Sequence, residues 1–298
     1  MNAKRLRDRI FQQEDLNFLL TNRIPRVLAT RFMGWYSKIE LPVVRDLSLS
    51  AWKLFTDLDL SDAKKEHFTS VHDCFTRELK PGARVIDPDP CALTSPCDAI
   101  VGQCGRIQGQ QIFQAKGFPY SVTELFGNGD ESAKYADGCY ATLRLRSNMY
   151  HRFHAPYDCR VGHVTYISGD TWNVNPIALK RVERLFCKNE RVAIRCELPS
   201  GGQTFALVAV AAVLVASVRL HCLGELFHPR YTGPQELACD ATYSKGQELG
   251  WFQHGSTIIM FAPRGFDLAE GIEAGVEIRM GRRLLTRPAT GDTTLRDS

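Results

Sequence analysis

The chain has 298 residues, of which 44% are hydrophobic and 23% are charged. These proportions are those of an ordinary globular protein, so they exclude a disordered or fibrous chain, and the length suffices for one large domain or two modest ones. The formal net charge of +4 is too small for a protein dedicated to nucleic acid, which carries a strong basic excess.

Basic residues are concentrated near the N-terminus. Residues 1–46 carry nine Lys or Arg and five Asp or Glu, so this stretch alone accounts for the net charge of the whole chain. Within it, four apolar residues recur at helical spacing and three basic residues flank them: Ile24, Leu28, Phe32 and Trp35, and Arg23, Arg26 and Lys38. The pattern predicts a basic amphipathic helix. Such a helix either lies in a membrane interface or packs on the rest of the protein.

Two further helices are predicted at residues 47–58 and 63–79, and a Lys-Pro-Gly turn ends the second. From Arg84 onward, short β-rich runs alternate with Gly, Pro, Asn and Asp turns. The predicted strands cover residues 100–109, 111–114, 140–145, 161–167, 192–196, 204–220 and 256–261. We therefore expect an α+β fold, in which basic amphipathic helices (residues 1–80) precede a mostly antiparallel β-rich domain (residues 81–298).

The longest apolar run, residues 205–218, is too short for a helix that spans a bilayer, which needs about 20 residues. Its Val-rich composition predicts one or two buried strands, so any membrane contact is expected to be peripheral. Ten cysteines are spread along the chain without CxxC spacing, and no secretory h-region precedes them. We expect reduced thiols, most of them buried, and no metal site.

Three short segments carry residues that can do chemistry. The first is SPCDA at residues 95–99, in which Asp98 follows a Pro-containing turn and would usually be a turn or cap residue. The second is YHRFHAP at residues 150–156, in which His151 and His154 can each act as an acid or a base near neutral pH. The two imidazoles would share a face on a helix and point to opposite sides on a strand. A zinc pair and purely structural histidines are the alternatives.

The third segment is FQHGSTII at residues 252–259. A Gly-Ser-Thr step before an apolar strand is usually only a turn. It is not the GxSxG elbow of hydrolases, because no Gly lies two residues beyond Ser256. Each segment alone is weak evidence for any one activity.

Together and in this order, the three segments resemble the phosphatidylserine decarboxylase family. The resemblance covers residues 68–285 and includes further motifs in the same order: FTRELKP at 75–81, ID at 86–87, QAKG at 114–117, GD at 169–170, VN at 174–175, NERV at 189–192 and KGQELG at 245–250. Several separate motifs in the right order are far more specific than any one of them.

The resemblance implies an inactive proenzyme that cuts its own chain between Gly255 and Ser256. The cut would leave a β chain of residues 1–255 and an α chain of residues 256–298. Ser256 would become an N-terminal pyruvoyl group, which is the cofactor of the family. The activity implied is decarboxylation of phosphatidylserine to phosphatidylethanolamine, a step of phospholipid biosynthesis.

The residues that the resemblance assigns to the cut are Asp98, His154 and Ser256. A serine hydroxyl needs a base within hydrogen-bond reach; His154 can take its proton, and Asp98 can fix the imidazole tautomer. Gly255 has no Cβ, which lets the hydroxyl approach the carbonyl before it. In the decarboxylation, a pyruvoyl group forms a Schiff base with the substrate amine and accepts electrons as CO2 leaves. The resemblance assigns His151 as the proton donor in that step.

Two positions depart from the family's pattern. Ala99 stands where a Gly commonly follows the catalytic Asp, and it would strain the turn if that position required a positive φ. His254 stands where an aliphatic residue commonly precedes Gly-Ser-Thr. Arg152, which follows His151 in the motif, either holds a substrate carboxylate or phosphate or forms a structural salt bridge.

Three other functions remain open from the residues alone. The same chemistry could act on a soluble amino acid. Asp98, His154 and Ser256 could instead form a serine hydrolase that is never cut. The chain could also be a non-catalytic, membrane-binding relative.

The expected partners are phosphatidylserine, an anionic membrane surface and the two chains of the cut precursor; a homodimer is also in keeping with the family, and nucleic acid is not expected. Glu14 and Asp15 and the lack of a Ser/Arg-rich leader argue against a mitochondrial transit peptide. We therefore expect a peripheral protein on the cytoplasmic face of a bacterial cell membrane.

Overall fold

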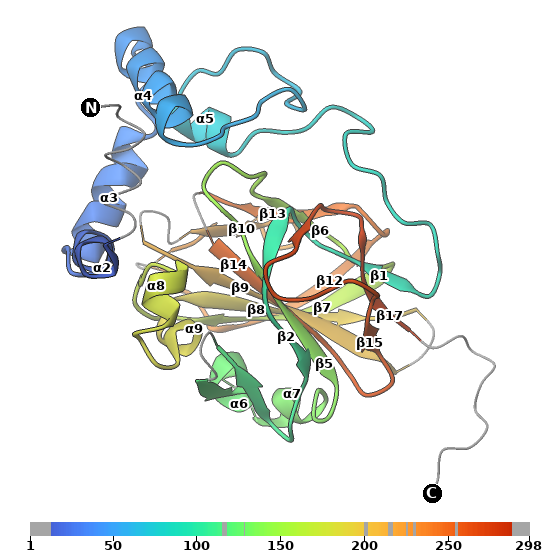
Figure 1. Ribbon diagram of the computed structural model, residues 1–298. Helices are drawn as coiled ribbons and strands as arrows, with labels where there is room; N and C mark the ends of the chain where they lie inside the picture. Colours follow the sequence, from blue (N-terminus) through green and yellow to red (C-terminus); the bar gives the residue numbers. More distant parts are fainter. Residues whose placement is uncertain are drawn as a thin grey trace, which may run out of the picture.

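The computed structural model describes residues 13–114, 118–127, 129–199, 202–213, 217–224, 226–228, 231–253 and 256–287. Its described helices begin with α2 (Glu14–Asn22), α3 (Arg26–Tyr36), α4 (Pro42–Phe55) and α5 (Val71–Phe75). In Figure 1 these blue and cyan helices stand beside a body of antiparallel strands. The arrangement confirms the expected α+β fold.

The helix expected from the apolar spacing after Arg23 is α3. It begins directly after Pro25, whose φ of −65° suits the start of a helix. Leu28, Phe32 and Trp35 are between 57% and 65% exposed, although large apolar side chains are normally buried. The interpretation of this stripe as one that packs on the rest of the protein is therefore wrong.

Polar contacts attach the α2–α3 region to the β-rich part of the protein, beside the apolar contact of Phe18 with the second hydrophobic core. Arg26 forms a bidentate ion pair with Asp170, with distances of 2.5 and 3.1 Å, and its guanidinium lies 3.8 Å from the centre of the Trp172 ring. The Asn22 amide oxygen accepts a hydrogen bond from the Asn173 N–H. At these contacts α3 turns the polar Arg26 toward the protein, and its stripe of Leu28, Phe32 and Trp35 stays outside.

The prediction of a helix over residues 63–79 is wrong, because only α5 is helical in that stretch. Ala63 and Leu79, the two ends of the predicted helix, lie side by side in an antiparallel bridge. Tertiary pairing therefore overrides the helical pattern. The helix predicted at residues 47–58 is α4, which starts earlier because Pro42 is well suited to a first turn.

An eight-stranded antiparallel sheet forms the centre of the fold, with the order β12-β7-β8-β9-β14-β5-β2-β16. Its strands are β2 (Ala99–Arg106), β5 (Cys139–Arg144), β7 (Cys159–Ile167), β8 (Arg191–Glu197), β9 (Thr204–Ala211), β12 (Glu236–Tyr243), β14 (Ser256–Ala262) and β16 (Glu277–Ile278). The strand that begins at Ser256 lies inside this sheet and is paired on both sides.

A four-stranded sheet has the order β11-β10-β13-β6. Its strands are β6 (Arg152–His154), β10 (Val218–Leu220), β11 (Leu226–Phe227) and β13 (Glu248–Phe252). Phe153 and Phe252 are fully buried in the same hydrophobic core as Ile258 of β14, so the two sheets share a core. The apolar run at residues 204–220 supplies β9 to one sheet and β10 to the other.

A second core covers the opposite face of the eight-stranded sheet. Ile259, the neighbour of Ile258, packs there with Phe126 and Phe186, as the alternation of a strand requires. The remaining elements are α6 (Val122–Phe126), α7 (Gly129–Ala133), α8 (Pro176–Leu179), α9 (Leu185–Lys188), β1 (Ala92–Thr94), β3 (Gln111–Phe113), β4 (Pro119–Ser121), β15 (Asp267–Leu268) and β17 (Arg283–Thr286).

The ten cysteines are free thiols and six of them are buried, as expected. Among the residues that the structure describes, no group of three or more His, Cys, Asp or Glu is arranged to hold a metal ion. No helix in the described ranges is long and apolar enough to cross a membrane.

Candidate active site

The connection from β13 to β14 carries the predicted cleavage point. Before it, the Phe252 N–H donates to the His151 carbonyl at 3.0 Å and the Gln253 N–H donates to the Ser217 carbonyl at 3.2 Å. After it, the backbone of Ser256 lies opposite Ala211 of β9. His254 and Gly255 lie outside the described residues. The connection therefore passes from one sheet to the other with described, paired backbone on both sides.

His151 lies at the end of β6 that faces this connection. Its side chain is fully buried, and its Nδ1 is 2.8 Å from the Met149 carbonyl oxygen. A carbonyl only accepts, so Nδ1 carries a proton, and Nε2 is the ring nitrogen left to exchange one. Gly255 is three residues beyond Phe252, a span of at most about 11 Å. The Phe252 hydrogen bond thus places His151 beside the start of the connection that carries the predicted cleavage point.

His154 lies at the other end of β6, opposite Glu248. Its Nδ1–H donates to the Gly246 carbonyl at 2.8 Å, and the Tyr150 hydroxyl donates to its Nε2 at 3.0 Å. Burial lowers the pKa of His154, so the imidazole is neutral at pH 7. Burial also raises the pKa of Tyr150, so its hydroxyl stays a donor. The strand alternative for the YHRFHAP segment is confirmed by β6, since Arg152 and His154 lie on the face opposite Phe153.

Asp98 immediately precedes β2 and is 8% exposed. Its carboxylate accepts hydrogen bonds from Arg84, with distances of 2.5 and 2.9 Å, and from the Met280 N–H at 2.9 Å. His154 and the Asp98 segment do meet, because the His154 N–H donates to the Pro96 carbonyl at 2.8 Å. The Asp98 carboxylate, however, is bonded to Arg84 and not to the His154 imidazole. The structure brings the two segments together without forming the predicted Asp–His hydrogen bond.

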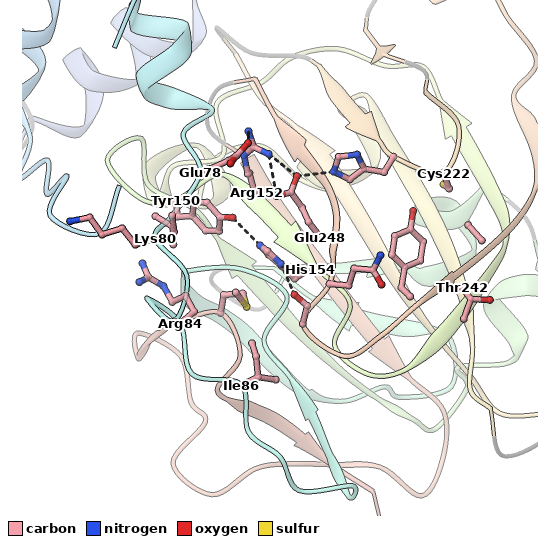
Figure 2. Close-up of a pocket in the computed structure, with 18 residues that line it drawn as sticks. Glu78, Lys80, Arg84, Ile86, Tyr150, Arg152, His154, Cys222, Thr242 and Glu248 are labelled. Carbon is pink, nitrogen blue, oxygen red and sulfur yellow. Dashed lines mark hydrogen bonds and ion pairs between the residues drawn. The ribbon is translucent and has the colours of Figure 1, made fainter. Parts of the chain in front are cut away.

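A cavity of about 840 Å³ opens beside the His154 end of β6. Figure 2 shows the Tyr150 hydroxyl pointing at His154 and Arg152 reaching Glu248. Arg152 and His221 each lie 2.8 Å from a Glu248 oxygen. Arg152 therefore forms the structural salt bridge, which was one of its two predicted roles. Its guanidinium is paired with Glu248 and is not left to bind a substrate anion.

The departure at Ala99 costs the backbone nothing. Ala99 begins β2, is fully buried and pairs with Ile278. Its φ is not positive, since Asp137 and Arg184 are the non-glycine residues with positive φ in the described ranges. The predicted strain is absent because this position is extended.

Glu190 is a further buried acid. In the sequence it stands out only as part of the NERV motif, and no role was predicted for it. It is 2% exposed, and its Oε1 accepts a hydrogen bond from the Tyr166 hydroxyl at 3.1 Å. Burial raises the pKa of Glu190 to about 8, which the Tyr166 hydrogen bond only partly offsets. Its carbonyl accepts from the N–H of Ala211, the residue opposite Ser256. A titrating carboxyl thus lies two strands from the predicted cleavage point.

Sequence reasoning found His151, His154 and Asp98 but missed their contacts. Tyr150 belongs to the same short segment as the histidines, so its closeness to His154 could have been predicted from the sequence. Arg84 carries no such signal, since it meets Asp98 only through the fold.

Comparison with known proteins agrees with this architecture. Residues 71–286, well over half of the chain, match the sequence profile of the phosphatidylserine decarboxylase family. The phosphatidylserine decarboxylase proenzyme of Shewanella sediminis is 34% identical over 281 residues, which cover 90% of this chain and 97% of that protein. The corresponding proenzyme of Brevibacillus brevis is 35% identical over 278 residues (91% and 97%), and that of Haemophilus influenzae is 32% identical over 270 residues (88% and 92%).

These similarities define the class of protein as a decarboxylase, which is a lyase. The chain belongs to the phosphatidylserine decarboxylase family.

Proposed function

We propose that the protein is a self-processing, pyruvoyl-dependent phosphatidylserine decarboxylase that works at a membrane surface. The observation that carries this proposal is the position of Ser256. It is the first residue of a strand held on both sides within the central sheet, and it follows a connection whose near end is bonded to the buried His151.

The fold suits a cut before Ser256. Strand β14 pairs with β5 and β9, β16 pairs with β2, and β17 pairs with β1. These pairs join the α chain, residues 256–298, to the β chain, residues 1–255. The two chains would therefore stay together after the peptide bond is lost.

In the proposed cut, the Ser256 hydroxyl attacks the Gly255 carbonyl while a base takes its proton. The acyl group moves from nitrogen to oxygen and forms an ester. A base then removes the Ser256 α-proton, and the β chain leaves as a carboxylate. The dehydroalanine that remains is hydrolysed to a pyruvoyl group with release of ammonia.

We propose His154 as the base of the cut, Asp98 as its orienting partner and Ser256 as the nucleophile. A neutral, buried imidazole with a lone pair on Nε2 can accept a proton, and the His154 backbone is bonded two residues from Asp98. The proposal requires His154 Nε2 to exchange its Tyr150 hydrogen bond for the serine hydroxyl. It also requires Asp98 to loosen from Arg84.

The surroundings of position 256 fit a prosthetic group made from that residue. Ala211, opposite it, is a small, fully buried residue, and His151 is buried at the near end of the connection. When present, a pyruvoyl carbonyl accepts electrons from an amine-linked substrate as CO2 leaves. His151 holds its Nδ1 proton on the Met149 carbonyl, so Nε2 would carry the proton delivered to the substrate carbon.

We propose that the exposed apolar face of the N-terminal helices binds an anionic phospholipid bilayer. Leu19, Leu28, Phe32, Trp35 and Leu47 are all more than half exposed. Apolar side chains with Trp among them, flanked by basic groups, suit the interface of an anionic bilayer. The substrate named for the relatives is itself a lipid, which stays in such a bilayer.

Exposed basic residues lie beside this face: Arg23, Arg31 and Lys38. A peripheral position on the cytoplasmic side of a bacterial cell membrane is the location that we propose. The alternative is a homodimer that buries the same face. Analytical ultracentrifugation with and without anionic vesicles distinguishes membrane binding from dimerisation.

The test of the proposed function is the intact mass of the purified protein under denaturing conditions. We expect two chains with the masses of residues 1–255 and 256–298, the smaller one blocked to N-terminal sequencing, and a single chain for Ser256→Ala. Phosphatidylserine in vesicles should release CO2 and free serine should not. A wild-type chain that stays whole on long incubation would contradict self-processing and favour an uncut serine hydrolase or a non-catalytic relative. Release of CO2 from free serine would favour the soluble-substrate alternative.

A further inference from the structure

Three aromatic rings connect helix α4 to His151. The rings of Trp52 and Phe75 are stacked, with centroids 5.8 Å apart and planes at 16°. The ring of Phe75 lies over the His151 imidazole, with centroids 3.9 Å apart and planes at 37°. We call Trp52, Phe75 and His151 the ring stack.

Phe75, the middle ring, is held from both sides. It is the last residue of α5 and is 3% exposed. On the helical side, the His72 N–H of α5 donates to the Ser37 carbonyl at the end of α3. On the side of the sheets, the carbonyl of Thr76, the next residue, accepts from Arg152 of β6 at 2.9 Å. Hydrogen bonds close to Phe75 in the chain therefore join the helices on one side to the sheets on the other.

Helix α4 has two different faces. On one, Trp52 packs against a small cluster that includes Phe68 and Cys74. On the other, Val43 and Leu47 are 71% and 67% exposed. Because both faces belong to one helix, a displacement of the exposed face would also displace Trp52.

The His151 imidazole has two constraints among the described contacts. The Met149 carbonyl holds the Nδ1 edge, and the Phe75 ring covers one face. Both contacts restrict the orientation of the imidazole, and with it the direction of Nε2. Proton transfer depends steeply on such geometry, and a misplacement of about 1 Å can cost about a hundredfold in rate.

We propose that Phe75 is a positioning residue for His151, and that the ring stack couples contact between α4 and a lipid surface to proton transfer at His151. The inference rests on the proposed role of His151 in decarboxylation. It assigns functions to Trp52 and Phe75, which touch neither Ser256 nor the cavity in the described contacts.

The activity experiment compares Phe75→Leu with Phe68→Leu in the full-length, processed protein. Phe68 is a matched control because it lies in the cluster beside Trp52 but outside the ring stack. For Phe75→Leu we expect normal self-processing and an unchanged KM, with kcat about tenfold lower on vesicles of phosphatidylserine and phosphatidylethanolamine. Phe68→Leu should change kcat less than twofold. Equal losses in the two variants would overturn the role of Phe75.

Trp52→Leu tests the coupling. Trp52 is only half-buried, so this variant keeps the test available even if Phe75→Leu fails to fold. We expect a lower kcat on vesicles but not on phosphatidylserine dispersed in detergent micelles. A loss of the same size in both forms of substrate would contradict coupling to a lipid surface.

A second readout does not depend on activity. Acylation of His151 by diethyl pyrocarbonate, measured by peptide mass, reports how well the imidazole is covered. We expect vesicles to change the acylation rate in the wild type but not in Trp52→Leu, and Phe75→Leu to be acylated faster than Phe68→Leu. A wild-type rate that vesicles leave unchanged would overturn the coupling. Absent self-processing in the wild type would instead count against the proposed function, while this acylation comparison still decides the coupling.

Discussion

The two ends of β6 place two histidines of one short segment in opposite surroundings. His151 lies under an aromatic ring next to the connection that leads to Ser256, without exposure to solvent. His154 lines the cavity and is bonded to Tyr150 and Gly246. A strand turns residues three apart to opposite sides. Two histidines three residues apart would share a face on a helix, but here they point to different surroundings. Each can therefore serve a different step, one the cut and the other the decarboxylation.

The largest effects should come from substituting each of the two histidines on its own. We expect His154→Gln to slow self-processing by about 10²- to 10⁴-fold, the usual contribution of a general base. His151→Gln should be processed normally and lose decarboxylation by a similar factor. Intact mass and CO2 release measure the two steps. Blocked processing in His151→Gln would contradict the separation and make His151, the histidine nearer the connection, the base of the cut.

The Arg84–Asp98 pair sharpens the comparison at the His154 end. The two side chains are 9% and 11% exposed, and their closest atoms are 2.5 Å apart. Arg84→Gln leaves the Asp98 charge buried without its partner, so we expect the free energy of unfolding to fall by about 3 kcal/mol. Arg84→Lys keeps the charge and should lose less. Urea denaturation of both variants checks this, and equal stability of Arg84→Gln and wild type would show that Asp98 does not depend on Arg84.

Glu190 adds a buried acid that belongs to neither end of β6. Its pKa is raised from 4.5 to about 8, so the folded protein binds this proton more tightly than the unfolded chain. The free energy of unfolding should therefore fall as the pH rises from about 4.5 to 8, with a slope from this group of up to about 1.4 kcal/mol per pH unit. Glu190→Gln should remove that part of the slope. Denaturation at pH 5, 6.5 and 8 measures it, and an unchanged slope in the variant would place the Glu190 pKa near its ordinary value.

The smallest effect is expected from the Tyr150 hydroxyl. Tyr150→Phe removes the hydrogen bond to His154, which should lower the free energy of unfolding by about 1 kcal/mol. Tyr157→Phe is the matched control, because it removes a hydrogen bond to the Pro90 carbonyl at an exposed position. Thermal denaturation of both variants gives the difference. A larger loss for Tyr157→Phe would contradict the view that the buried pair is the stronger of the two.

Local patterns predicted the regular elements where local forces dominate. The apolar spacing around Leu28 predicted α3, and the β-rich runs predicted most strands of the central sheet. Each of these segments carries its own pattern of apolar and polar residues, which can be read locally. The helix expected over residues 63–79 failed, because pairing of Ala63 with Leu79 outweighs a helical pattern. The strand β13 was not predicted, although it carries the KGQELG motif.

The candidate site divides in the same way. The residue types of Asp98, His151 and His154 and their family were available from the motifs. The choice between a helix and a strand for the two histidines was not, because a stretch of three residues has no periodicity to measure.

The sequence by itself determined the class of fold, the family and the identities of the groups that can carry protons. Only the tertiary structure decided that Arg84 holds Asp98, that Phe75 covers His151 and that Ser256 begins an inner strand of the central sheet. The physical reason is that these contacts join residues far apart in the chain. Sheet register and core packing set their geometry, and neither leaves a signal in any single segment.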